Sequence, residues 1–186
     1  MKVLEKAANG ILYDANNDPE IQAEHEKALA ILFQLRNTDP CNKDEIDKLF
    51  KLLFGHLGNN HVIEIPFYCG FGKNIFIGDY FYANYNCTIV DNAEVKIGNH
   101  VFLAPNVSIY TAGHPLDFRT RNLGMEFAKP VTIEDNVWIG GNSTILPGVT
   151  IGHGSVIGAG SVVVKSIPPD TVAAGNPCKE IKKIDN

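Results

Sequence analysis

Long hydrophobic runs and concentrated basic charge are both missing from this chain of 186 residues. No apolar run approaches the roughly 18 residues of a membrane-spanning helix, so we expect no membrane segment. The net charge is −5 and no basic stripe is interleaved with aromatic residues, which argues against nucleic acid as a partner. The first residues, MKVLEKAANGILYDANN, contain no apolar segment of the kind that directs secretion. We therefore expect a cytoplasmic protein.

Cysteine is also scarce, and its spacing excludes a common kind of metal site. The four cysteines form no CxxC pair, so a structural zinc site is not indicated and free thiols in a reducing compartment are expected. The apolar content of 45% and charged content of 20% are ordinary for a globular protein. A chain of this length fits one domain with a small extension.

Residues 1–58 are predicted to form a helical segment. Asp18 is suited to cap a helix that begins at Pro19, and Asp39-Pro40 ends it. Apolar residues recur there at helical spacing: Ile21, Ala28, Leu29, Leu32 and Leu35. A second helix is expected over NKDEIDKLFKLLFGHLG, before Gly55 and Gly58. Its apolar face consists of Ile46, Leu49, Phe50, Leu53 and Phe54.

From Ile65 the chain follows a six-residue rhythm. The first hexads read IPFYCG, FGKNIF, IGDYFY, ANYNCT and IVDNAE, and after Val95 and Lys96 come IGNHVF, LAPNVS and IYTAGH. The rhythm stops over residues 111–130, TAGHPLDFRTRNLGMEFAKP, and then resumes with IEDNVW, IGGNST, ILPGVT, IGHGSV, IGAGSV and VVKSIP. The first position is almost always aliphatic, and the fifth is usually small or β-branched. Such a repeat indicates a solenoid.

A short strand followed by a tight turn every six residues gives a coil with three faces. Each coil takes about 18 residues and rises by one strand spacing, roughly 4.8 Å. The first position of each hexad points inward, and Gly or Asn takes the corners. We expect a mainly β protein with about five such coils over residues 59–170, one long irregular loop at 111–130, and a C-terminal tail at 171–186.

These hexads resemble the left-handed parallel β-helix of the hexapeptide-repeat acyltransferases. A narrower resemblance is to the maltose and galactoside O-acetyltransferases, and it covers nearly the whole chain. The segments that carry it are GILYDANNDPE, FYANYNCTIVDNA, IGNHVFLAPNVSIYTAGHPLD, DNVWIGG and IPPDTVAAGNPCKEIKKI. The left-handed winding is implied by this resemblance alone, since most β-crossovers are right-handed. The resemblance also implies acetyl transfer from acetyl-CoA to a sugar hydroxyl by a cytosolic homotrimer, without a metal.

The resemblance assigns catalytic roles. His114 occupies the family's GHP position and would act as the general base, for which an imidazole is suited at neutral pH. Asn84 matches an asparagine that forms hydrogen bonds near the acceptor hydroxyl and the histidine. Glu126 is a hypothesis of our own: a carboxylate could orient His114 through its second ring nitrogen. A surface carboxylate and a simple turn-capping histidine are the plain alternatives.

Acetyl-CoA contacts follow from the same resemblance. Trp138, the only tryptophan, would line the cleft, and the Gly141 amide would stabilise the oxyanion. Small or narrow residues would line the path of the pantetheine arm, namely Ala104, Ala159 and Val164. Lys165, Lys179 and Lys182 would meet the phosphates, and lysine lacks the bidentate fork of the arginine found at the last two positions in relatives.

The acceptor-binding positions depart from the family. Gly70 stands where relatives have Asp or Ser, and Asn92 stands where galactoside enzymes have a second acidic residue after Asp91. Asp91 itself could be a turn residue. Asp14 and Asn16 lie in the N-terminal stretch that contributes a polar contact to the acceptor. The acceptor is therefore left open among sugars and similar hydroxylated molecules.

The loop 111–130 gives the solenoid its one irregular feature. Functional residues of solenoids tend to lie in such insertions. We expect the loop to reach a neighbouring chain and form sites between subunits of a trimer.

Three alternatives use a similar scaffold. A streptogramin-type xenobiotic acetyltransferase would use the same histidine, but that type lacks the LYDAN arm. A zinc carbonic anhydrase needs three histidines, and only His56 and His61 have the required spacing of five, before the repeats begin. A non-catalytic trimeric scaffold would not need His114, Asn84 and Trp138.

Overall fold

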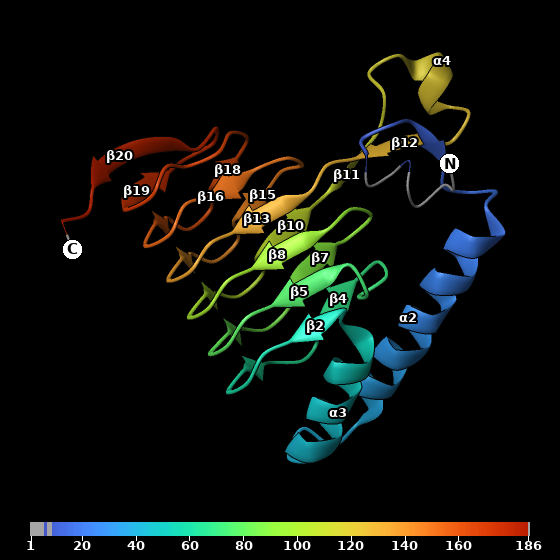
Figure 1. Ribbon diagram of the computed structural model, residues 1–186, viewed down its shortest axis with the longest axis horizontal. Coiled ribbons are helices and arrows are strands. Elements are labelled where there is room, and N and C mark those ends of the chain that lie inside the picture. Colours follow the sequence, from blue (N-terminus) through green and yellow to red (C-terminus); the bar gives the residue numbers. More distant parts are fainter. Residues whose placement is uncertain (1–5, 7–8, 186) are drawn as a thin grey trace.

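A computed structural model of the chain describes residues 6 and 9–185. Residues 1–5, 7–8 and 186, which belong to the predicted helical segment and tail, lie outside this part. The chain forms a stack of β-coils, with two helices along one side near the first coils and a strand at the far end (Figure 1). The prediction of a mainly β solenoid with an N-terminal helical segment is confirmed.

Three parallel sheets form the faces of the solenoid. The first face contains β2 (His56–Leu57), β5 (Ile75–Ile77), β8 (Val95–Ile97), β13 (Val131–Ile133) and β16 (Thr150–Ile151). The second contains β3 (Val62–Ile63), β6 (Tyr82–Ala83), β9 (Phe102–Leu103), β14 (Trp138–Ile139), β17 (Val156–Ile157) and β19 (Thr171–Ala174). The third contains β4 (Tyr68–Cys69), β7 (Thr88–Val90), β10 (Ser108–Tyr110), β15 (Thr144–Ile145) and β18 (Val162–Val163). At the end of the stack, β20 (Lys179–Lys183) pairs antiparallel with β19.

The solenoid makes about six turns, whereas we expected about five. The second face has six parallel strands, and on the first face the bridge Ile151↔Ile167 adds a sixth level. The additional pairing lies at the two ends, in His56–Leu57 and Thr171–Ala174. We started the repeats at Ile65 and ended them at Pro168, although Leu57-Gly58 and Ala173-Ala174 continue the pattern of an apolar residue followed by a small one.

The core is a stack of aliphatic side chains along the solenoid axis. First-position residues such as Ile89, Ile109 and Ile139 are fully buried, as predicted. Fifth-position residues also point inward, and where they are serines their hydroxyls are satisfied by the backbone. Ser143 and Ser155, for example, donate to the carbonyls of Gly158 and Pro168. Buried polar groups of this kind add no unpaired donor to the core.

Asparagine turns the corners between faces. At the corner between the second and third faces, Asn86, Asn106 and Asn142 adopt left-handed backbone angles, with φ near 60°. Asn tolerates this region because its short side chain can bond locally. The corner between the first and second faces has the same φ at Tyr80 and His100, whose rings stack 4.6 Å apart.

At the third corner, between the third and first faces, the hexad spacing is exceeded three times. Phe76 lies 20 residues after its partner His56 and 20 before its partner Lys96, whereas Thr132 and Thr150 are 18 apart. We had expected a two-residue excess only before Ile97. The longer turns fall near residues 70–74 and 91–94, and the loop 111–130 follows at the same corner. Three successive coils therefore project extra chain from one edge.

The loop 111–130 is more regular than we expected. It contains β11 (Ala112–Gly113), α4 (Phe118–Arg121) and β12 (Met125–Ala128), and β12 pairs antiparallel with β11. On its other side β12 pairs with β1 (Tyr13–Asp14) from the N-terminal arm. The sequence did not indicate this small sheet, because the loop has no hexads and the third strand comes from a distant part of the chain.

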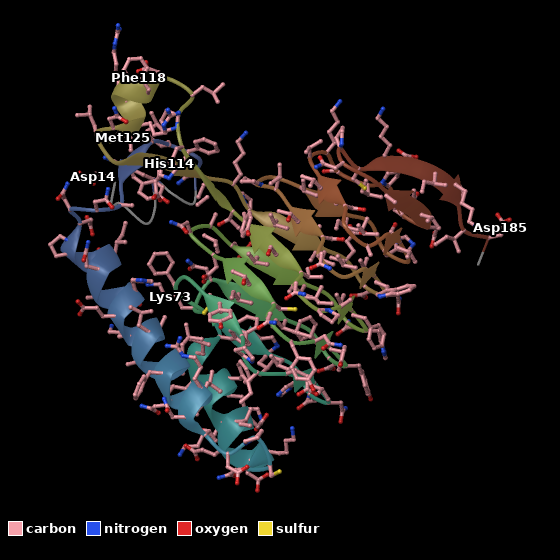
Figure 2. The ribbon with its side chains drawn as sticks, turned by 180° about the vertical axis from the view of Figure 1, so that it is seen from behind. Asp14, Lys73, His114, Phe118, Met125 and Asp185 are labelled. Atoms are coloured by element: carbon pink, nitrogen blue, oxygen red, sulfur yellow. The ribbon has the colours of Figure 1, made fainter. Side chains whose placement is uncertain are left out.

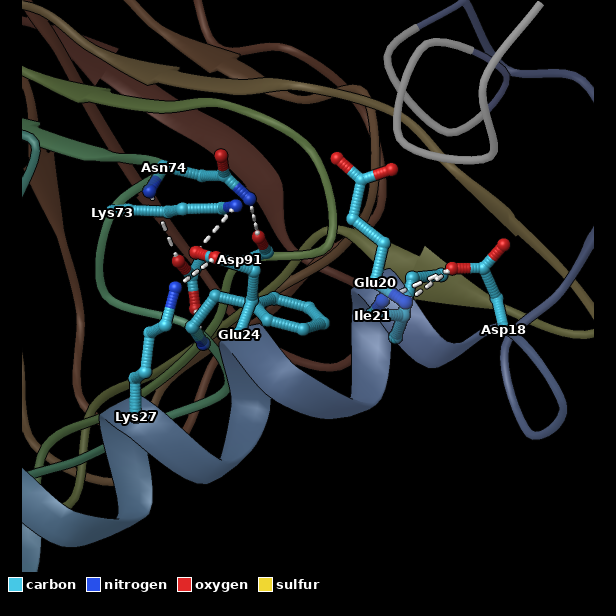
Figure 3. Close-up of polar contacts among 9 residues, drawn as sticks. Asp18, Glu20, Ile21, Glu24, Lys27, Lys73, Asn74 and Asp91 are labelled. Atoms are coloured by element: carbon cyan, nitrogen blue, oxygen red, sulfur yellow. Dashed lines mark hydrogen bonds and ion pairs between the residues drawn. The ribbon is translucent and has the colours of Figure 1, made fainter.

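The two helices begin and pack largely as predicted. The Asp18 carboxylate accepts from the Glu20 and Ile21 amides at the start of α2 (Pro19–Asn37), as Figure 3 shows. The second helix, α3 (Lys43–Leu53), buries the whole apolar face predicted for it. One residue of the α2 face was wrong: Leu29 is 44% exposed.

A buried carboxylate fixes the third corner. Asp91 is fully buried and accepts from the backbone amides of Gly70 (3.0 Å), Phe71 (2.8 Å) and Asn74 (3.3 Å) in the preceding coil. Its carbonyl also accepts from the Asn74 amide side chain, as drawn in Figure 3. Burial raises the pKa of the Asp91 carboxyl, and the backbone hydrogen bonds oppose that shift. Thr111 continues the ladder in the next coil by accepting from the Ala93 amide.

An ion-pair cluster joins α2 to this corner. The Glu24 carboxylate lies 2.7 Å from Lys27 in the same helix and 2.7 Å from Lys73 in the solenoid (Figure 3). Hydrogen bonds from these two ammonium groups lower the pKa of Glu24 from 4.5 to about 2. The charged form of Glu24 therefore favours the folded state.

We expect Glu24→Gln to lower the free energy of unfolding at neutral pH by less than about 1 kcal/mol, because solvent screens such a pair. A depressed carboxyl pKa stabilises the fold above its unfolded value of 4.5, and this contribution is lost as pH falls toward 2. Urea denaturation of both proteins at pH 7 and pH 3 should show the difference shrinking at pH 3. Glu45→Gln, which breaks only the exposed pair with Lys48, is the control. An equal loss at both pH values would contradict the assignment.

Asp91→Asn should lower the free energy of unfolding by about 1–3 kcal/mol, because an amide keeps one acceptor oxygen and leaves one buried N–H unpaired. Asp91→Ala should cost more, since it removes all the acceptors. Thermal denaturation measures both. Asp79→Asn is a matched control. The Asn59 backbone and side-chain N–H groups both donate to the same oxygen of Asp79 in exposed contacts, and an asparagine retains that oxygen. A loss at Asp91 no larger than at Asp79 would exclude the role given to the buried carboxylate.

Candidate functional site

His114 lies at the third corner, in the loop between β11 and α4. Its Nδ1 is 3.1 Å from the carbonyl oxygen of Met125. A carbonyl oxygen only accepts, so Nδ1 carries the proton and Nε2 of the neutral ring keeps its lone pair. The side chain is 51% exposed. Figure 2 shows His114 and Met125 together beside the N-terminal arm. His114 is therefore held in the tautomer that a general base needs.

We expected Glu126 at the ring nitrogen that orients His114, but it lies nearest the other nitrogen, Nε2. Its Oε1 is 3.9 Å from His114 Nε2, beyond a hydrogen bond, while Met125 takes the orienting contact at Nδ1. Two donors hold its Oε2: the Tyr13 hydroxyl at 3.1 Å and the Asn92 side-chain amide at 3.2 Å. Asn92 also donates to the Tyr13 oxygen at 3.0 Å. Three chain segments thus meet in one polar network next to His114 Nε2.

A cavity of about 330 Å³ opens beside this network. It brings together four of the predicted residues, Asn16, Gly70, Asn92 and Glu126. The remaining lining residues are Ala15, Ile21, Gln22, His25, Phe71 and Val90. Its lining has amides, one imidazole and one carboxylate, but no lysine or arginine. Such a surface suits an uncharged molecule with several hydroxyls and one apolar face.

A helix residue, His25, contacts the backbone at Gly70. His25 in α2 places Nδ1 2.8 Å from the Gly70 carbonyl oxygen, and its ring meets Phe71 edge-on at 6.1 Å. An added Cβ at Gly70 would lie 3.3 Å from Asp91 Oδ1, so the position is close to the buried carboxylate. His25 was not among the residues that the sequence singled out.

Asp14 faces its own turn. Its carboxylate accepts from the Asn16 and Asn17 backbone amides and from the Asn17 side chain, and this last bond lowers the Asp14 pKa. Asn16 packs instead toward the loop: a Cβ added at Gly124, where φ is +80°, would lie 2.4 Å from Asn16 Nδ2. The N-terminal arm and the loop are therefore fitted to each other.

A second cavity, of about 450 Å³, lies along the second face. It contains three predicted residues, Asn84, Ala104 and Trp138, together with Tyr82, Phe102 and Leu103. Phe102 and Trp138 pair in register, and both are about half exposed, at 49% and 54%. No residue lines both cavities. Within one chain, Asn84 and Trp138 therefore do not share a pocket with the His114 corner.

A column of small residues follows the corner beyond this second cavity. The backbone amides of Asn84, Ala104 and Gly140 donate to the carbonyls of Leu103, Ile139 and Ile157, respectively. The three residues therefore occupy the same corner in successive coils. A Cβ at Gly140 would lie 2.5 Å from the Ala159 nitrogen, which shows how closely neighbouring coils approach. Gly141 and Ala159 sit one residue further along the same corner. No hydrogen bond from the Gly141 amide to another described residue is found.

The predicted lysines lie at the end of the stack. Lys179 pairs with Ala174 and Lys182 with Val172, both on the last strand of the second face. Val164 and Lys165 directly follow β18 and are exposed. All four positions thus belong to the last coils, away from the His114 corner.

Sequence reasoning missed Tyr13 and the Met125 carbonyl. Tyr13 is 2% exposed and was hidden inside the LYDANN motif, where the aspartate and asparagine were the obvious polar candidates. A backbone carbonyl leaves no mark in a sequence. Among residues 6 and 9–185, no group of three or more His, Cys, Asp or Glu side chains could hold a metal ion. In the same part of the chain, no helix combines the length and apolar character that crossing a bilayer requires.

Comparison with known proteins shows which family has this architecture. Residues 130–165 match the bacterial transferase hexapeptide family, and residues 6–58 match the maltose acetyltransferase hexapeptide capping motif. The galactoside O-acetyltransferase of Escherichia coli is 46% identical over 84% of this chain and 77% of its own. A maltose O-acetyltransferase structure from Clostridium difficile has a TM-score of 0.98 at 46% identity, covering 100% of this chain and 99% of that one. A galactoside acetyltransferase in complex with coenzyme A has a TM-score of 0.95 at 39% identity, with coverage of 100% and 92%. The chain belongs to the maltose and galactoside O-acetyltransferase family of hexapeptide-repeat acetyltransferases.

Proposed function

We propose that this protein transfers the acetyl group of acetyl-CoA to a hydroxyl of an uncharged sugar or similar molecule. The observation that carries the proposal is the His114 geometry: Nδ1 is occupied by the Met125 carbonyl, and Nε2 lies 3.9 Å from Oε1 of Glu126, a residue that lines the cavity. Family membership supplies the donor, since a related acetyltransferase is described with coenzyme A.

His114 acts as the general base. Its Nε2 removes the proton of the acceptor hydroxyl as the oxygen attacks the thioester carbonyl carbon. The resulting tetrahedral oxyanion is stabilised by the Gly141 amide, which has the free N–H such a role needs. As the carbon–sulfur bond breaks, the imidazolium returns the proton to the leaving thiolate. The products are the acetyl ester and CoA.

The acceptor occupies the cavity beside Glu126. The side-chain amides of Asn16 and Gln22 offer both donors and acceptors to hydroxyls, Asn92 offers its amide oxygen as an acceptor, and Phe71 offers an apolar face. The lining has no cation to neutralise a phosphate, and its one carboxylate would repel an anion. A neutral sugar or glycoside therefore fits better than a sugar phosphate.

Acetyl-CoA lies along the column of small residues at the other corner. Ala104, Gly141 and Ala159 leave room for a narrow pantetheine arm next to Trp138. The column leads toward the last coils, where Val164 and Lys165 follow β18. Lys179 and Lys182 lie there too, and their positive charges attract the phosphates of acetyl-CoA.

Residues from two chains complete each site. The His114 corner and the Asn84–Trp138 cavity are separate in one chain, and both carry exposed apolar surface. The loop exposes Leu116 (97%) and Leu123 (72%), and the second face exposes Trp138 (54%). Contiguous exposed apolar surface marks an interaction site. A cyclic homotrimer in which the loop of one chain faces the second face of the next would cover both surfaces.

His114→Ala should lower acceptor-dependent thiol release from acetyl-CoA by about 10²-fold or more, because it removes the general base. The assay is run over a panel of sugars, glycosides and sugar phosphates, with antibiotic acceptors included. His56→Ala, at an exposed histidine of β2, is the control and should retain wild-type rates. Undiminished release by His114→Ala would contradict the assignment. Release only with an antibiotic would replace the sugar acceptor by a xenobiotic one.

Mixing two inactive variants tests the shared site. When His114→Ala and Asn84→Ala chains are co-refolded in equal amounts, about a quarter of the wild-type activity should return, because random assembly pairs an intact His114 with an intact Asn84 from the next chain. Light scattering of the mixture checks the trimer. Activity that stays at the level of the separate variants would mean that each site is built within one chain.

A further inference from the structure

We infer that Tyr13 is a positioning residue of the active site, which fixes the Glu126 carboxylate facing His114 Nε2. This inference rests on the function proposed above. It assigns a role to the N-terminal arm that neither the hexad pattern nor the shape of the solenoid requires. Tyr13 is a buried phenol in a strand of two residues, at a distance of more than a hundred residues in sequence from its partner.

The backbone places the phenol over the carboxylate. Tyr13 and Glu126 are direct partners in the antiparallel pairing of β1 with β12. Directly opposite residues of an antiparallel pair project their side chains to the same face. The 3.1 Å contact between the Tyr13 hydroxyl and Glu126 Oε2 is therefore a consequence of register, and slipping the pairing by one residue would abolish it.

The hydrogen-bond count in this network leaves one carboxylate oxygen available. A phenol has a single proton, and Tyr13 gives it to Glu126 Oε2. The two hydrogens of the Asn92 amide go to the Tyr13 oxygen and to the same Oε2. Both donors thus hold Oε2, and Oε1 is the oxygen that lies 3.9 Å from His114 Nε2. Without the phenol, only Asn92 would restrain the carboxylate.

The surroundings keep Tyr13 neutral and immobile. Its ring packs with Ile21, Phe71, Ala93 and Ala128, which join the arm, α2, the third corner and the loop. Burial raises the pKa of the Tyr13 phenol, so it remains a donor across the range in which the enzyme would work. A rigid neutral donor is well suited to holding an anion in one orientation.

The consequence for function is that acceptor binding depends on the arm. A carboxylate fixed beside the base can accept a hydrogen bond from the acceptor and hold its reacting hydroxyl toward Nε2. Acetyl-CoA is bound by other residues, so its binding should not depend on Tyr13. This separates a positioning role from a merely structural one.

Tyr13→Phe tests the inference, because it keeps the buried ring and deletes only the hydroxyl. We expect kcat/KM for the acceptor to fall by about tenfold, with the KM for acetyl-CoA unchanged. In a Glu126→Ala background the same substitution should change kcat/KM by less than about twofold, because the group it positions is gone. Tyr68→Phe, which deletes an exposed phenol hydroxyl on β4, is the matched control and should leave both proteins unchanged. An equal loss in both backgrounds, or no loss in either, would overturn the inference.

A second readout does not depend on turnover. The imidazole resonances of His114 in a ¹H–¹⁵N spectrum should shift in Tyr13→Phe and in Glu126→Ala, and should stay in place in Tyr68→Phe. Unchanged His114 signals in Tyr13→Phe would overturn the inference even if the wild type transfers acetyl normally. If the wild type transfers acetyl to no acceptor, the proposed function fails, while these spectra still decide whether Tyr13 positions Glu126.

Discussion

The buried Asp91 carboxylate is the contact on which the third corner, with His114, depends. It accepts from three backbone amides of the preceding coil. The Gly70 amide also donates to the Ile89 carbonyl, so without the carboxylate it is the Phe71 and Asn74 amides that would be left unpaired. A regular coil has no such donors, because its turns are shorter and its amides pair with the next coil. The carboxylate thus permits extra chain at one corner only. The cavity wall at Gly70 and Phe71 and the amide of the neighbouring Asn92 are both placed by this arrangement.

The solenoid supplies a rigid framework, and its insertions carry the residues proposed for the chemistry. The stacked aliphatic core gives each face a fixed register, so a column of small residues at one corner stays aligned over several coils. The third corner carries the departures from the hexad spacing: two long turns, the loop with His114, and a shorter turn before Ile167 in the last coil. A base on an insertion can be aimed independently of the core, and the core can be packed without regard to the base.

The N-terminal arm links these parts physically. The strand Tyr13–Asp14 adds a third strand to the loop sheet, and α2 is anchored to the solenoid by the Glu24–Lys73 pair and by His25 at Gly70. A loop held on one side only would be free to move with its histidine. Pairing with the arm supplies backbone hydrogen bonds on the second side. The match of residues 6–58 to a capping motif is consistent with this arrangement: the segment supports the loop that carries His114 as well as covering the first coils.

The sequence by itself determined the repeat, most of the inward positions and the two helices, and it singled out His114 as a candidate base. The aliphatic first position repeats every six residues because each face of a coil buries one first-position residue. Asp18-Pro19 marks a helix start through local hydrogen bonding alone. His114 stood out because it ends the last hexad before the break. Only the tertiary structure decided which residues surround it. Tyr13, Asn92 and Glu126 meet through strand pairing between distant segments, and neither the Met125 carbonyl nor the burial of Asp91 has a local sequence signal.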